Sequence, residues 1–150
     1  MIWNTLYILH DTDDATIAQA IAQAFGVPAG AVVVEDAPAR TSLSGSVILA
    51  RRDDYRAREP ETEFPVELTI VVPSDVRILA RSDAERLALI ARALRVPFMA
   101  SLDEDDQDTM RLVLPDGDLL ERDLGDVDVI LSPSDRERMA VWQRPAGRAA

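Results

Sequence analysis

The sequence predicts an α+β fold in which a mixed or antiparallel sheet carries two main helices on one face. Apolar, strand-like runs alternate with two segments whose apolar residues recur at helical spacing. Pro115-Asp116-Gly117 lies between two apolar segments and predicts a hairpin, which a purely parallel sheet would not contain. The 150 residues, 47% of them hydrophobic, suit a single compact domain.

The first half of the chain predicts a strand, a helix and two more strands. The helix begins after Asp13 or Asp14, either of which can cap its free N–H groups, and it ends at Gly26. Ile17, Ile21, Ala24 and Phe25 share one helical face. The predicted strands cover residues 6–9, 31–34 and 46–50, and residues 36–45 predict a loop.

The second half repeats this order after residues 51–63, a charged segment that predicts a solvated connector. Ser82 and Glu85 have the spacing of a capping box before the second helix. Ser132-Pro133 predicts the start of a short C-terminal helix within residues 132–150. The predicted strands of this half cover residues 66–72, 96–102, 110–114, 118–124 and 127–131.

The two predicted helices resemble one another. Residues 14–28 and 83–97 share Asp-Ala at the start and Val-Pro at the exit. A tandem β-α-β-β duplication, with halves 1–51 and 65–131, explains this similarity. Chance similarity between two amphipathic helices rich in Ala, Ile and Leu explains it equally well.

Negative charge is concentrated in one stretch of the sequence. The net charge is −11. Residues 101–131 contribute −9 of it, because this stretch contains eleven acids and only two basic residues, Arg111 and Arg122. A surface of this charge disfavours nucleic acid and anionic membranes and attracts a basic protein. We expect the partner-binding residues to be Asp103, Glu104, Asp105, Asp106, Asp108, Asp116, Asp118, Glu121, Asp123, Asp126 and Asp128.

No catalytic or cofactor motif stands out in the sequence. The single histidine, His10, precedes Asp11, Asp13 and Asp14, which suit metal binding, proton transfer or simple helix capping. Residues 103–108 lack the glycine and glutamate of a calcium loop. The glycines form no phosphate-binding loop, so we expect no cofactor, no metal and no catalytic residues.

The compartment is also constrained by the sequence. There is no cysteine, and the N-terminus lacks the basic start and cleavage site of a signal peptide. No apolar run approaches the ~20 residues of a membrane span. We therefore expect a cytoplasmic protein.

These features leave three functional hypotheses. In size, acidity and lack of catalytic motifs, the chain resembles the immunity proteins of bacterial toxin systems. That resemblance implies a non-enzymatic inhibitor that binds a basic toxin through residues 103–128. A homo-oligomeric regulatory or small-ligand-binding module is the second hypothesis, with a homodimer as its simplest form. A hydrolase that uses His10 and nearby carboxylates is the third.

Overall fold

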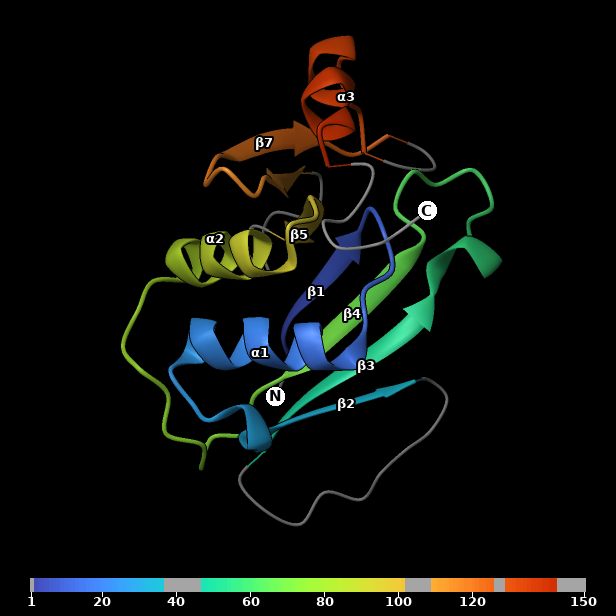
Figure 1. Ribbon diagram of the computed structural model, residues 1–150. Helices are drawn as coiled ribbons and strands as arrows, with labels where there is room; N and C mark the ends of the chain where they lie inside the picture. The colour runs from blue at the N-terminus through green and yellow to red at the C-terminus, as the bar shows by residue number, and fades with distance from the viewer. Residues whose placement is uncertain (1, 37–46, 102–108, 126–128, 143–150) are drawn as a thin grey trace.

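The computed structural model describes residues 2–36, 47–101, 109–125 and 129–142, and it has the predicted α+β fold (Figure 1). The strands are β1 (Ile2–Ile8), β2 (Val32–Asp36), β3 (Ile48–Asp54), β4 (Val66–Val71), β5 (Phe98–Ser101), β6 (Thr109–Val113) and β7 (Leu119–Asp123). The α-helices are α1 (Asp14–Phe25), α2 (Asp83–Leu94) and α3 (Pro133–Ala140), and short 3-10 turns occur at η1 (Ala29–Ala31) and η2 (Tyr55–Ala57).

The described strands form one mixed sheet in the order β2-β3-β4-β1-β5-β6-β7. Only β2 and β3 pair in parallel, and all other neighbours are antiparallel. The two halves of the chain are interleaved, since β4 lies between β3 and β1, while β1 lies between β4 and β5. Consequently β1, β2 and β3 run in the same direction, and their C-terminal ends lie at the same end of the sheet.

One face of the central strands is apolar because their residues alternate. In β4, Val66, Leu68 and Ile70 are buried. The buried Leu6 and Ile8 of β1 pair with Leu68 and Val66 on the same face. Helices α1 and α2 lie together across this face (Figure 1). The two main helices therefore share one side of the sheet, as the sequence predicted.

The helix boundaries follow local signals in the sequence. The Asp13 side chain accepts a hydrogen bond from the Thr16 N–H (2.7 Å), which fixes the start of α1. Gly26, with φ +68°, ends it. Ser82 caps α2, which ends at Arg95 in the left-handed region with φ 58°. An arginine at this position is strained where glycine would not be.

Helix α3 packs beside β7, away from α1 and α2 (Figure 1). Its first turn has a full capping box formed by Ser132 and Asp135. The buried carboxylate of Asp135 also accepts two hydrogen bonds from Arg122 of β7, both 2.7 Å long. Met139 adds a buried apolar contact. Polar contacts thus account for much of the attachment of α3.

The structure departs from the sequence prediction in the charged connector. Residues 51–54 continue strand β3, because Arg51 and Arg52 lie in register with Glu35 and Asp36 of β2 and form ion pairs with them. The predicted last strand is reduced to an isolated bridge between Leu124 and Val129, and residues 126–128 lie outside the described residues.

The element order of the two halves agrees with the proposed repeat, but the third strands are placed differently. Strand β3 lies parallel beside β2, whereas β6 forms a hairpin with β5. The duplication therefore remains a prediction. Within the described residues, no helix has both the length and the apolar character that crossing a membrane requires.

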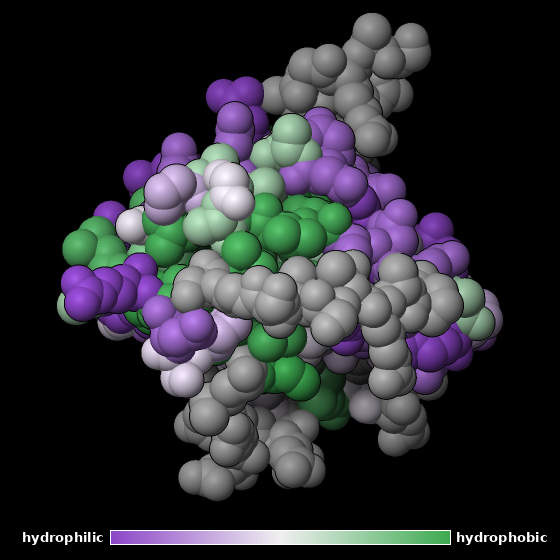
Figure 2. Space-filling model, turned by 90° about the horizontal axis from the view of Figure 1, so that it is seen from below, coloured by the Kyte–Doolittle hydropathy of each residue, from purple (hydrophilic) through white to green (hydrophobic). Residues whose placement is uncertain are grey.

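The view from the β2 side shows where apolar surface remains. Apolar residues gather in the middle of this view, and hydrophilic residues border them (Figure 2). Strand β2 forms this edge of the sheet, and its Val33 and Val34 are only half-buried.

Candidate functional site

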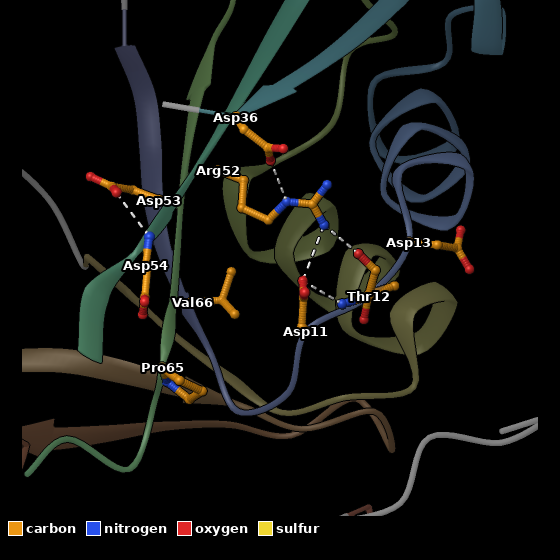
Figure 3. Close-up of a pocket in the computed structure, with 9 residues that line it drawn as sticks. All are labelled: Asp11, Thr12, Asp13, Asp36, Arg52, Asp53, Asp54, Pro65 and Val66. Atoms are coloured by element: carbon orange, nitrogen blue, oxygen red, sulfur yellow. Dashed lines mark hydrogen bonds and ion pairs between the residues drawn. The ribbon is translucent and has the colours of Figure 1, made fainter. Parts of the chain in front are cut away.

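An open pocket of about 630 Å³ lies at the end of the sheet where β1, β2 and β3 finish (Figure 3). The loop after β1 supplies one wall, the end of β2 and the end of β3 supply the next, and the start of β4 closes it. Its lining residues are Asp11, Thr12, Asp13, Asp36, Arg52, Asp53, Asp54, Pro65 and Val66. The parallel run of β1, β2 and β3 brings these distant segments together.

Arg52 crosses one side of the pocket and binds three carboxylates. Its Nε donates to Asp36 (3.0 Å), and its Nη1 donates to Asp11 (3.1 Å) and to the main-chain oxygen of Thr12 (2.6 Å). Its Nη2 pairs with Asp14 of α1. Its positive charge is therefore compensated by carboxylates of the protein itself, and its side chain is only 15% exposed.

The remaining carboxylates are less fully neutralised. Asp13 caps α1, and its charge is favoured by the positive end of the helix dipole. Asp53 accepts the Asp54 N–H (2.8 Å) and lies 3.6 Å from Arg58. Asp54 is exposed and lines the pocket. Five aspartates against one arginine give the lining a net charge of −4.

A pocket of this charge attracts cations. Carboxylates in a concave wall concentrate the negative potential, because the protein beside them is a poor dielectric. Among the described residues, no group of three or more metal-ligating side chains could hold a metal ion. Carboxylate oxygens form charge-assisted hydrogen bonds with ammonium and guanidinium groups, so the five aspartates of the lining suit such a cation.

His10 is adjacent in sequence to this pocket but is not among its lining residues. It follows β1, is half-buried, and takes part in interactions within the protein. The hydrolase hypothesis requires His10 to face a pocket together with carboxylates. A pocket does lie at the expected end of the first strand, and Asp11 and Asp13 are among its lining residues, but His10 is not.

Only four of the eleven acids in the sequence-predicted partner surface fall in the described residues. Asp116 and Asp118 lie in the β6–β7 turn and bind Arg138 of α3. Glu121 and Asp123 are exposed on β7. The others lie outside the described residues: Asp103, Glu104, Asp105, Asp106, Asp108, Asp126 and Asp128.

The described residues that flank the acidic segments lie close together. Thr109 follows one acidic segment and pairs with Asp123 of β7. Val129 follows the other and pairs with Leu124. Thr109 and Val129 therefore both lie at the Asp123 end of β7. The Asp116 and Asp118 pair lies at its opposite end, roughly 13 Å away for a five-residue strand.

Sequence reasoning missed the contribution of Asp36, Arg52, Asp53 and Asp54 to the pocket. The signal was the run Arg51-Arg52-Asp53-Asp54 directly after an apolar strand, but it resembled a solvated connector.

Against known proteins, no family model, no curated protein and no solved structure matches the chain.

Proposed function

We propose that the protein is a non-catalytic binding module that holds a basic protein partner, as an immunity protein holds a basic toxin. The observation that carries this proposal is the pocket at the ends of β1, β2 and β3, whose lining has a net charge of −4. Its single arginine is already bound by Asp11, Asp14 and Asp36. An incoming lysine or arginine therefore meets an excess of carboxylate.

The openness of the pocket and the exposure of its aspartates also support binding of a basic protein. The pocket is open, so a side chain projecting from a protein surface can reach its walls. Asp54 is exposed, which suits attraction of a basic partner from solution. Asp53 is half-buried, which suits contact with the bound side chain. Complementary charge raises association rates and selects the partner more than it raises affinity. Residues 103–128, including the exposed Glu121 and Asp123, would provide a second acidic contact.

The test measures binding of a fluorescent nonaarginine peptide by anisotropy. The variant Asp53→Asn with Asp54→Asn removes two pocket charges, and the amide oxygen of the new Asn at position 53 can still accept the N–H of residue 54 in place of the carboxylate oxygen. The matched control, Glu85→Gln with Glu137→Gln, removes two exposed charges from α2 and α3. We expect roughly tenfold weaker binding for the pocket variant, since the two solvent-accessible charges contribute about 1.4 kcal/mol together.

Salt provides the second measurement. Binding to the intact protein should weaken strongly between ~0.01 M and ~0.15 M ionic strength, where the Debye length falls from ~30 Å to ~8 Å. If the pocket variant and the control bind the peptide equally well, the pocket is not the contact surface and the proposal fails.

A small cationic ligand is a second candidate, because the volume of about 630 Å³ is typical of small-molecule sites. Arginine or spermidine would then saturate the pocket and compete with the peptide. If neither competes while the peptide still depends on Asp53 and Asp54, a protein partner is favoured.

A further inference from the structure

Arg52 joins three segments of the chain at one side of the pocket (Figure 3). Asp36 ends β2, Asp11 and Thr12 belong to the loop after β1, and Asp14 lies in the first turn of α1. All of them bind the same guanidinium, through its Nε, Nη1 and Nη2 atoms. Asp11 is 41 positions away from Arg52 in the sequence, so this contact is purely tertiary.

The exposure of these side chains shows which group supplies the order. The Arg52 side chain is 15% exposed. The side chains of its partners Asp11, Asp14 and Asp36 are between 61% and 77% exposed. Exposed carboxylates keep their rotational freedom unless a partner orders them. The planar fork of a guanidinium can hold several carboxylates in fixed directions at once, which the point charge of a lysine ammonium cannot.

Arg52 also fixes the main chain of one pocket wall. Its Nη1 donates to the Thr12 oxygen (2.6 Å) and to Oδ1 of Asp11 (3.1 Å). The Thr12 N–H donates to the same Oδ1 (2.9 Å). The next residue, Asp13, caps α1. These bonds set the path by which the loop enters the helix, and with it the position of the wall that residues 11–13 form.

We propose that Arg52 is a positioning residue of the pocket, whose guanidinium holds Asp11 and Asp36 in place for a cationic group of the partner. This inference rests on the proposed function, because it assumes that the pocket binds a cation. The charge of Arg52 opposes such a ligand, whereas its geometry favours binding, since a preordered site binds at a lower entropic cost. A substitution that keeps the charge and removes the fork therefore isolates the positioning role.

The experiment compares Arg52→Lys with Arg51→Lys, using the nonaarginine peptide at about 0.15 M ionic strength. Both arginines lie on β3 and form ion pairs, but Arg51 does not line the pocket. Both substitutions keep the net charge. We expect Arg52→Lys to bind the peptide about fivefold more weakly than Arg51→Lys, which is the cost of ordering about one side chain on binding. Circular dichroism and urea unfolding check that both variants fold.

The wild-type protein provides a second measurement that depends on no variant. The Nε–H of Arg52 donates to Asp36 (3.0 Å), and NMR can follow its exchange with solvent. A positioning role requires this bond to persist in the complex, so exchange should be no faster when the peptide is saturating. Faster exchange at saturation would show that the peptide displaces the guanidinium, and it would overturn the inference.

Equal affinities for Arg52→Lys and Arg51→Lys would also overturn it. This failure can be told apart from failure of the proposed function. If only the positioning role is wrong, Asp53→Asn with Asp54→Asn still weakens peptide binding while Arg52→Lys does not. If the proposed function is wrong, the double variant has no effect, and the inference falls with it.

Discussion

The buried pair between Asp135 and Arg122 gives the most quantitative prediction. Asp135 is 3% exposed and accepts two hydrogen bonds from the guanidinium, each 2.7 Å long. The Arg122 hydrogen bonds, together with the N–H and hydroxyl of Ser132, lower the pKa of Asp135 from 3.8 to about 2. Asp135→Asn removes the charge but keeps an oxygen that can cap α3.

The direction of the shift fixes the pH dependence. A carboxyl whose pKa is lower in the folded state stabilises it above the unfolded pKa and loses that contribution as pH falls through the folded pKa. The shift corresponds to about 2 kcal/mol in the free energy of unfolding near neutral pH. This contribution of Asp135 should fall to about 0.5 kcal/mol or less by pH 2, where half of the native carboxyl is protonated.

Urea unfolding followed by tryptophan fluorescence measures the effect. Wild type and Asp135→Asn are compared at about pH 6 and about pH 2, and only the difference between them is used, because other acids also titrate. We expect a difference of about 2 kcal/mol at the higher pH and near zero at the lower. A difference that does not shrink on acidification would refute the assignment of this pair as the source of the stability.

Three further substitutions test the backbone and the other face of the sheet. Gly26→Ala should destabilise the protein by about 1–3 kcal/mol in urea unfolding, because φ is +68° and a Cβ would lie 2.5 Å from Cβ of Leu79. Arg95→Gly should raise the free energy of unfolding by about 0.5–1 kcal/mol, since it relieves a left-handed, exposed arginine; a loss would contradict this. Burial, then the charge of Glu67, raise the pKa of Tyr7 to about 12, so stability should fall as pH rises from 10 to 12. In Tyr7→Phe that fall should be smaller.

Local features of the fold could be predicted from the sequence. The starts of α1, α2 and α3 were predicted because Asp13, Ser82 and Ser132 act within three residues of themselves. The β6–β7 hairpin was predicted because Gly117 permits a turn with positive φ. Each of these signals involves neighbours in sequence, so no knowledge of strand pairing was needed.

The pocket could not be predicted because it depends on strand pairing. Asp36 and Arg52 are 16 residues apart and meet only because β2 lies parallel beside β3. The same pairing moves Arg51 and Arg52 out of the expected connector and into the sheet. Asp11 joins them because β1 runs in the same direction two strands away. Charge counting along the chain identified an acidic segment but could not show which carboxylates share a concave wall.

The interleaved order of the central strands constrains how the chain can fold during synthesis. Strand β1 needs β4 on one side and β5 on the other, and β3 needs β4, so the first 60 residues contain no complete neighbour set for β1. A nascent chain leaving the ribosome therefore cannot pair either edge of β1 until Val66–Val71 emerges. Closure of the sheet around β1 waits further, until Phe98–Ser101 has been made. Long-range closure of this kind slows folding. Neither half released alone should form a stable sheet, because β1 would lack β4 and β5, and β4 would lack β3 and β1.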